Sequence, residues 1–351
     1  MPRLLLIAAS LALSAAAPPQ QLPDPAVVAT VASLPDYIPQ HQVNGTIRIW
    51  GHGSAKRNFM GGLVARWADE FQHLQPGVHF ENHLYGTASA IGALAVGEAD
   101  MALLGEEISP AAGRLFHRAR GYAPTGISVA TGSLDANYFD YAHMIFVRRD
   151  NPLARLTLQQ VGAIFGDDRH CTPRPIRTWG DLGLKGEWAG KPITPYGWKT
   201  DVDFGLFVAE RAICGSHRWN PAMREFVHLP QPDGSQYDHG QQIVDALARD
   251  RYGIAVSNVR YTNPDVRPIA LAWTAKGPFV PATNASLVAE TYPLVRIIPV
   301  FVDRAPGRPI TPVVAEFLRY ILSRQGQRAL IEESAYLPLN RQTLLHERAK
   351  L

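Results

Sequence analysis

The chain has 351 residues, of which 46% are hydrophobic and 19% are charged, and its formal net charge is +3. This length is enough for two domains, and the composition is typical of a globular protein with a large core. The basic residues are scattered, and so small a net charge excludes a polycationic nucleic-acid-binding protein. We therefore expect no nucleic acid among the partners.

Residues 1–17 have the pattern of a secretory signal peptide. Arg3 precedes a short apolar run that ends in the small residues Ala15–Ala17, where cleavage is expected. A membrane anchor is the alternative, but the apolar run is shorter than the roughly 20 residues that span a bilayer. No cysteine follows that would carry a lipid. We expect a periplasmic or secreted protein.

Residues 18–44 are rich in Pro, Gln, Ala and Val, and we expect an irregular arm or linker there. From Gly45 the pattern alternates between strand and helix. Strands are expected at 45–50, 78–85, 99–104, 141–147, 192–196, 253–257 and 299–302, and helices at 59–72, 89–96, 156–165, 204–213, 241–248, 313–322 and 326–331. Thr157 is the expected N-cap of its helix. The alternation predicts an α/β protein with parallel or mixed sheets.

Two of these units read as a strand, a glycine-rich turn and a helix. The first strand runs into Gly51-His-Gly-Ser-Ala-Lys56, and the second runs into Gly86-Thr-Ala-Ser-Ala-Ile-Gly92. Helix N-termini carry unpaired N–H groups and partial positive charge, so they bind anions. Two such ends at neighbouring strand tips would form a cradle for an oxyanion. The alternative is that Ser54, Thr87 and Ser89 only cap their helices.

Cys171 and Cys214 are the only cysteines of the chain. In an exported protein they would form one disulfide. Two buried free thiols are the alternative, because spacing alone does not show whether two side chains meet.

The order and spacing of several short motifs resemble the phosphate-type periplasmic substrate-binding proteins of ABC importers, which have the type II periplasmic-binding-protein fold. The resemblance covers 45–339 and rests on Gly51-His-Gly-Ser54, Tyr85-Gly-Thr-Ala-Ser89 with Gly92, Ala99-Asp-Met-Ala102, Asp150-Asn-Pro-Leu153, Leu156-Thr157, Ile164-Phe165-Gly166, Thr178-Trp179, Tyr252-Gly-Ile-Ala255, Tyr292-Pro-Leu294, Pro306-Gly-Arg-Pro309, Phe317-Leu-Arg-Tyr320, Gln325-Gly-Gln327 and Tyr336-Leu-Pro338. It implies an α/β architecture of two lobes, with mixed sheets flanked by helices and a ligand cleft between the lobes.

The resemblance also implies lobe boundaries and ligand-binding positions. Lobe 1 is expected to comprise 45–143 and the returning segment 291–345, with lobe 2 at 144–290. Family members surround a dehydrated oxyanion with donors from two loops of lobe 1, and an acidic residue accepts the proton of a protonated phosphate. The positions that match are Gly53, Ser54 and Ala55 in the first loop, Thr87 and Ser89 at the second helix start, and Glu106 at the acidic position.

The loop at 196–203 departs from the family pattern. Tyr196 stands where the family has an arginine, and Thr200, Asp201 and Val202 stand where it has Ser-Gly-Thr. Lys199 would restore a positive charge, although as a point charge and not a bidentate fork. Asp201 brings negative charge to the same loop. We expect Lys199, Thr200 and Asp201 to contact the ligand; an N-cap cluster is the alternative.

Metal and enzyme chemistry find little support in the sequence. His79 and His83 share one face of a strand but are about 13 Å apart, too far to bind one metal together. No Gly-x-Ser-x-Gly elbow, dinucleotide fingerprint or phosphate P-loop occurs. We expect no metal, no cofactor and no enzymatic activity.

The sequence therefore predicts an exported, monomeric solute-binding protein that captures a small oxyanion, with phosphate as the first candidate, and passes it to an ABC permease. The first alternative is a secreted two-lobed sensor or accessory protein with a different ligand or none. A periplasmic phosphoester hydrolase is the second alternative.

Overall fold

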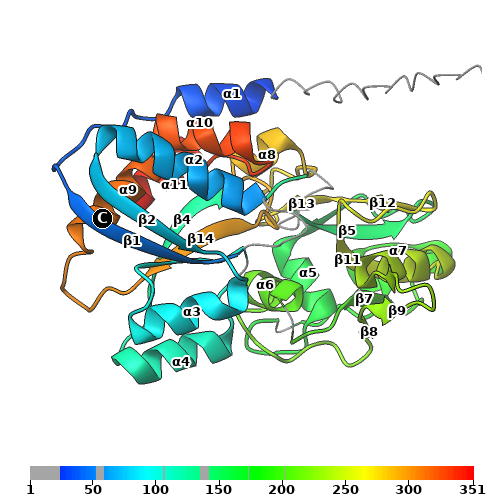
Figure 1. Cartoon of the computed structure of the whole chain (residues 1–351). Helices are drawn as coiled ribbons and strands as arrows, with labels where there is room; N and C mark the ends of the chain where they lie inside the picture. Colours follow the sequence, from blue (N-terminus) through cyan, green and yellow to red (C-terminus); the bar gives the residue numbers. More distant parts are fainter. Residues whose placement is uncertain (1–23, 53–58, 106, 135–141, 173, 202) are drawn as a thin grey trace, which may run out of the picture.

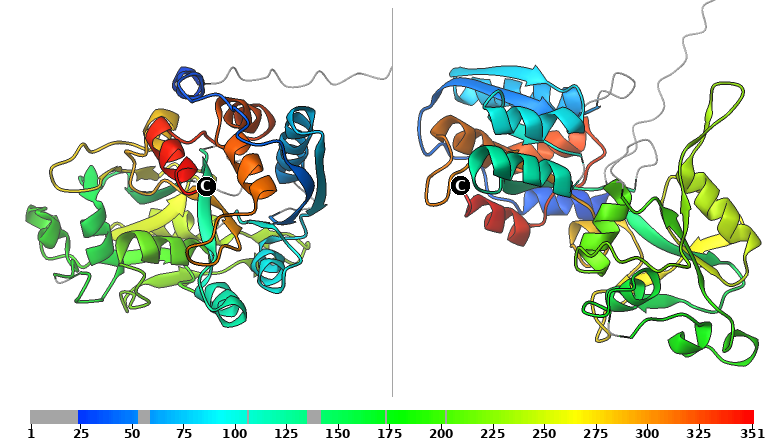
Figure 2. Two further views of the ribbon diagram at one scale, coloured as in Figure 1. Left: turned by 90° about the vertical axis from the view of Figure 1, so that its left-hand side faces the viewer. Right: turned by 90° about the horizontal axis from the view of Figure 1, so that it is seen from below.

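Two five-stranded sheets lie side by side in the computed structural model, each flanked by helices (Figure 1). The structure describes residues 24–52, 59–105, 107–134, 142–172, 174–201 and 203–351. Seen from below, the two sheets and their helices form two separate bodies that meet in the middle (Figure 2). The predicted fold class, mixed α/β in two lobes, is confirmed.

The first sheet has the strand order β2-β1-β3-β14-β4. Its strands are β1 (Asn44–Gly51), β2 (Gly77–His83), β3 (Met101–Leu103), β4 (Thr125–Thr131) and β14 (Ile297–Val302). β1 is parallel to β2 and β3, whereas β14 is antiparallel to β3 and β4. A strand from near the C-terminus thus lies inside a sheet built from the N-terminal part of the chain.

Helices cover both faces of the first sheet. One face is covered by α2 (Phe59–Leu74), α9 (Pro312–Ile321), α10 (Arg324–Glu333) and α11 (Arg341–Arg348), and the other by α3 (Thr87–Val96) and α4 (Pro110–Arg120). Phe71 of α2 and Phe317 of α9 have their ring centroids 5.1 Å apart in the core. Burying a side chain of this size stabilises the fold by about 1.5–3 kcal/mol. The C-terminal helices therefore pack on the N-terminal sheet.

The second sheet has the strand order β12-β5-β11-β7-β8. Its strands are β5 (His143–Arg148), β7 (Thr194–Trp198), β8 (Arg224–Phe226), β11 (Gly253–Asn258) and β12 (Val266–Pro268), and its helices are α5 (Leu158–Phe165), α6 (Asp203–Ala212), α7 (His239–Arg249) and α8 (Asn284–Val288). Two short ladders accompany it, β6 (Arg155–Thr157) with β13 (Ala270–Ala272), and β9 (Leu229–Pro230) with β10 (Gln236–Tyr237). The expected N-cap at Thr157 is confirmed, since its hydroxyl accepts the Gln160 N–H.

Two connections run together between the sheets. One follows β4 and the other precedes β14. The Gly132 N–H donates to the Arg296 carbonyl at 2.7 Å, and the His143 N–H donates to the Leu294 carbonyl at 3.3 Å. Paired connections of this kind provide a place where two bodies can bend relative to each other.

A disulfide joins Cys171, after α5, to Cys214, after α6, with a Cα–Cα distance of 6.0 Å. Asp167 N–H donates to the Arg218 carbonyl beside it, and Ser216 Oγ donates to Asp168 Oδ2 at 2.6 Å. The two segments are therefore held together by hydrogen bonds as well as by the covalent bond.

The prediction of an irregular arm is wrong for residues 25–32, which form α1 (Pro25–Ala32). Asp24 caps this helix by accepting the Ala26 N–H, and Pro25 lies in its first turn. Val27 and Val31 are buried against the fold. Two short 3-10 helices, Trp179–Leu182 and Gly186–Trp188, lie between α5 and β7. Across the described residues, no helix is both long and apolar enough to span a membrane.

Candidate functional site

The ends of β1, β2 and β3 meet at one edge of the first sheet. Trp50 and His83 are paired at the ends of the parallel strands β1 and β2. The Gly86 N–H donates to the Gly51 carbonyl at 2.9 Å, and the His52 N–H donates to the Leu103 carbonyl at 2.8 Å. Gly51 has no room for a side chain, because a Cβ there would lie 2.0 Å from the Leu103 oxygen. Ligands of open α/β sheets bind at such carboxyl ends.

Helix α3 begins at this edge with an open N-terminus. Its N-cap is Gly86, whose φ of 134° favours glycine, and no described side chain caps the first turn. The Ser89 hydroxyl donates to the Gly86 carbonyl at 2.8 Å, and Thr87 Oγ1 lies 3.3 Å from His52 Nδ1. Neither Thr87 nor Ser89 is the cap of this helix. The positive end of the α3 dipole therefore faces the edge where β1, β2 and β3 end.

Four of the expected ligand-binding residues cannot be placed. Gly53, Ser54, Ala55 and Glu106 lie outside the residues that the structure describes. The first three follow the end of β1, and Glu106 follows the end of β3, so their described neighbours belong to the same edge of the sheet.

The loop after β7 has its charges paired within itself. Lys199 Nζ lies 2.9 Å from Asp201 Oδ2, and this hydrogen bond raises the pKa of Lys199 and lowers that of Asp201. Thr200 Oγ1 donates to Glu225 Oε1 at 3.1 Å. In this structure Asp201 is the acidic partner of Lys199, and Glu225 is the acidic partner of Thr200. No described side chain of this loop offers an uncompensated positive charge.

Tyr196 does not occupy a position from which it could replace an arginine. Its hydroxyl donates to Asp250 Oδ2 at 2.9 Å, and burial with this contact raises the pKa of Tyr196 to about 12. Asp250 follows α7 and precedes β11, so the phenol points to the edge where β11 begins. The loop after β7 starts at the opposite edge.

Charged residues that the sequence analysis did not single out lie between the two sheets. Arg296 has a side chain only 1% exposed and pairs with Glu107 at 2.9 Å. Its guanidinium stands 5.2 Å from the Phe204 ring centroid of α6. Burial lowers the pKa of Arg211, which donates to the Val295 carbonyl. Arg296 lies within the apolar run Leu294-Val-Arg-Ile-Ile298. A charged residue inside an apolar run could have been used to predict a buried ion pair from the sequence.

A cavity of about 440 Å³ adjoins these charges. It is lined by Glu107, Ile108, Phe207, Glu210, Arg211, Ile297, Pro299 and Phe301. The lining includes α6 of the second sheet and β14 of the first, so the cavity lies between the two bodies. Two carboxylates and one arginine face it, a mixed set of charges and not a purely cationic one.

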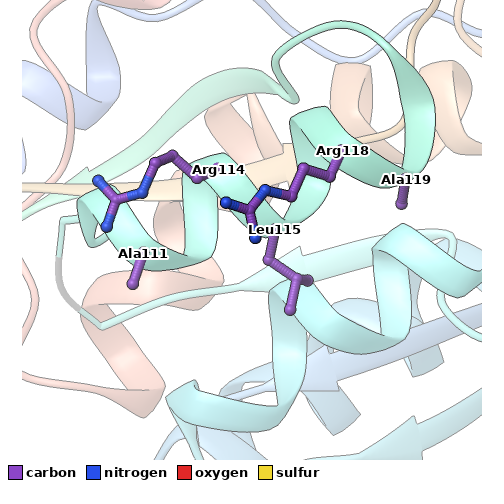
Figure 3. Close-up of a pocket in the computed structure, with 5 residues that line it drawn as sticks. All are labelled: Ala111, Arg114, Leu115, Arg118 and Ala119. Carbon is purple, nitrogen blue, oxygen red and sulfur yellow. The ribbon is translucent and has the colours of Figure 1, made fainter.

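A second hollow, of about 550 Å³, lies along α4 (Figure 3). All its lining residues come from that helix: Ala111, Arg114, Leu115, Arg118 and Ala119. No strand end contributes to it, which distinguishes it from the edge where β1, β2 and β3 end.

No family model matches this chain. It is 31% identical over 316 residues to the phosphate-binding protein PstS of Pseudomonas aeruginosa, covering 90% of this chain and 89% of that protein, in each of two strains. The crystal structure of PstS from Borrelia burgdorferi has a TM-score of 0.51 at 9% identity and covers 85% of this chain and 100% of that chain.

The structural likeness supports the fold, and the sequence likeness extends over nearly the whole length of both proteins. Both relatives are named as phosphate-binding proteins, in agreement with the expectation of a binding protein. With nearly a third of its residues identical over this length, the chain belongs to the PstS family, and the resemblance found in its sequence is confirmed.

Proposed function

We propose that this chain is an exported solute-binding protein that captures a small oxyanion, phosphate first, between two lobes and passes it to an ABC importer. Membership of the PstS family supports this proposal. The observation that carries it is the open N-terminus of α3 at the common edge of β1, β2 and β3. Backbone amides at such a position match the oxygens of a tetrahedral anion.

The lobes of the proposal are 45–143 with 291–345, and 144–290. Closure would bend the paired connections beside Gly132 and Leu294 and bring α6 towards α3. Binding and release need no bond chemistry. The chain acts as a monomer, which size-exclusion chromatography with light scattering would test. Export would be tested by finding the N-terminus of the mature protein after Ala15–Ala17.

The loop after β7 determines how strongly the second lobe attracts the anion. Asp201 compensates Lys199, so Asp201→Asn leaves the ammonium available to an incoming oxyanion. We expect Asp201→Asn to tighten phosphate binding severalfold and Lys199→Ala to weaken it. Lys185→Ala is the matched control, because it removes an exposed lysine of the same lobe from outside this loop.

The experiment is calorimetric titration, with thermal unfolding as a second measurement, against phosphate, sulfate, a phosphonate and an amino acid. A ligand that binds only the folded state at a hundred times its dissociation constant stabilises it by about 2.7 kcal/mol. We expect phosphate to bind saturably and to raise the unfolding temperature. Saturable binding of another solute with no response to phosphate would contradict the choice of ligand.

A sensor or accessory protein is the second candidate function, favoured by the charge pairing of Lys199 with Asp201. Such a protein keeps the two-lobed fold and binds a partner instead of a small solute. It predicts no saturable binding of any of the four ligands, and no effect of Asp201→Asn on phosphate.

A further inference from the structure

Two histidines and one aspartate come together at the start of α7. The antiparallel ladder pairs Leu229 of β9 with Tyr237 of β10. In this register, His228 and Asp238 occupy the next facing positions, one before β9 and the other after β10. His239 follows as the first residue of α7, which lies close to β9 in Figure 1. A short hairpin therefore brings together residues that are ten positions apart in the chain.

The three side chains converge on one carboxylate oxygen. Asp238 Oδ1 lies 3.7 Å from His228 Nδ1 and 3.8 Å from His239 Nε2. One ligand atom from each of the three residues lies within 4.8 Å of the others. The two imidazole rings are stacked, with centroids 3.9 Å apart and planes at 22°.

The two histidine nitrogens lie at distances from Asp238 Oδ1 that are close to the ligand spacing of a tetrahedral metal ion. Because an imidazole lone pair lies in the plane of its ring, one ring must turn out of the stack for both nitrogens to reach the same ion. Zinc–nitrogen and zinc–oxygen bonds of about 2.0–2.2 Å place neighbouring ligands roughly 3.3–3.5 Å apart. The two distances to Asp238 Oδ1 exceed this by only a few tenths of an ångström. The side chain of His228 is 44% exposed and that of Asp238 is 31% exposed, which leaves an open side for a water ligand.

The surrounding contacts hold the ligands in place. The buried Gln242 amide donates to the carbonyls of Val227 and Tyr237, at 2.7 and 2.8 Å. These carbonyls belong to the residues just before His228 and Asp238, so one side chain fixes the backbone at both. Asp238 Oδ1 also accepts the Gly240 N–H at 3.1 Å, which orients the carboxylate. Contacts outside the ligand set are a usual feature of metal sites.

We propose that His228, Asp238 and His239 bind a divalent transition-metal ion of the zinc, nickel or copper class. Two imidazoles and one carboxylate suit these ions, whereas Mg²⁺ and Ca²⁺ take sets of oxygen ligands. The His239 ring lies 6.3 Å from the Trp198 ring at the end of β7 and 6.0 Å from the Phe204 ring of α6. The site is thus near the loop after β7, but it does not depend on the proposed capture of an oxyanion.

The test is a calorimetric titration of the tag-free, chelator-treated protein with Zn²⁺ in a phosphate-free buffer. We expect one Zn²⁺ per chain and a loss of affinity of at least about tenfold in both His228→Ala and Asp238→Asn. Asparagine is as good an N-cap as aspartate, so Asp238→Asn keeps the start of α7. Bound Co²⁺ should give the strong visible absorption of a four-coordinate site, and both variants should lose it.

His73→Ala is the matched control, because His73 Nδ1 lies 3.9 Å from Asp69 Oδ2 without a second histidine nearby among the described ligand groups. It should bind Zn²⁺ as the unmodified protein does. The proposal is overturned if no saturable Zn²⁺ binding occurs, or if His228→Ala and Asp238→Asn bind Zn²⁺ as tightly as the control.

Discussion

Removing the disulfide between Cys171 and Cys214 should lower the free energy of unfolding without changing the native fold. The bond closes a loop with a sequence separation of 43 residues. In the chain-entropy model, closing a loop of this length removes about 13 cal/mol/K from the unfolded ensemble, or about 4 kcal/mol at 25 °C. The hydrogen bonds between Ser216 and Asp168, and between Asp167 and Arg218, remain in the variant.

The assay is urea unfolding of the variant with both Cys171→Ala and Cys214→Ala, followed by circular dichroism and tryptophan fluorescence. We expect the free energy of unfolding to fall by about 2–4 kcal/mol, since measured losses often stay below the model value. The unmodified protein in reductant should match the variant, and reductant should not affect the variant. A loss below about 0.5 kcal/mol, or a changed native spectrum, would refute the reasoning that the bond acts through the unfolded chain.

Two further predictions concern packing and pH. Gly162→Ala should lower the free energy of unfolding in urea by about 1–3 kcal/mol, because its Cβ would lie 2.1 Å from the Ala212 carbonyl oxygen. Gly113→Ala is the control, since a Cβ there meets nothing within 4 Å, and this variant should be neutral or slightly stabilising. Burial raises the pKa of Tyr37 from its ordinary value of 10.0 to about 12. The folded state therefore holds the Tyr37 proton more tightly than the unfolded state does. This difference contributes fully to the free energy of unfolding below pH 10, and the contribution is lost between pH 10 and 12, at up to about 1.4 kcal/mol per pH unit. In alkaline unfolding titrations Tyr37→Phe should show a shallower decline, and an unchanged slope would contradict the assignment.

Periodicity was sufficient where a helix has an apolar face. The helix expected at 59–72 is α2, Phe59–Leu74, and its apolar positions at Leu63, Val64, Trp67 and Phe71 are all buried. α4 gave no such signal, because Phe116 is its only fully buried residue. The start of α4 could nevertheless be predicted from the sequence, since Ser109 caps the helix and Pro110 follows in the first turn.

The candidate site was predictable at the ends of the strands and not elsewhere. Gly51 and Gly86 were identified from glycine-rich turns, which depend on local sequence, whereas the hydrogen bond between them depends on how the strands pair in the structure. The cluster of His228, Asp238 and His239 depends on the register of two-residue strands, which carry almost no apolar pattern. The Pro-Asp-Gly sequence at 232–234 was the available signal, because it is a strong turn former between the two histidines.

The contacts of Tyr196 indicate a role in stability and not in ligand binding, a distinction that sequence alignment cannot make. Alignment of motifs suggests that the family arginine was lost here, but the side chain points to Asp250 and also accepts from Arg224 Nη1 at 3.4 Å. Tyr196→Phe removes a hydrogen bond to a charged group, so the free energy of unfolding should fall by about 1.5–3 kcal/mol. Phosphate affinity should remain unchanged, because the phenol lies at the edge of the second sheet opposite to the loop after β7. If titration of Tyr196→Phe showed weakened phosphate binding with unaltered stability, position 196 would belong to the binding site, and the ligand cleft would have to be placed at the other end of β7.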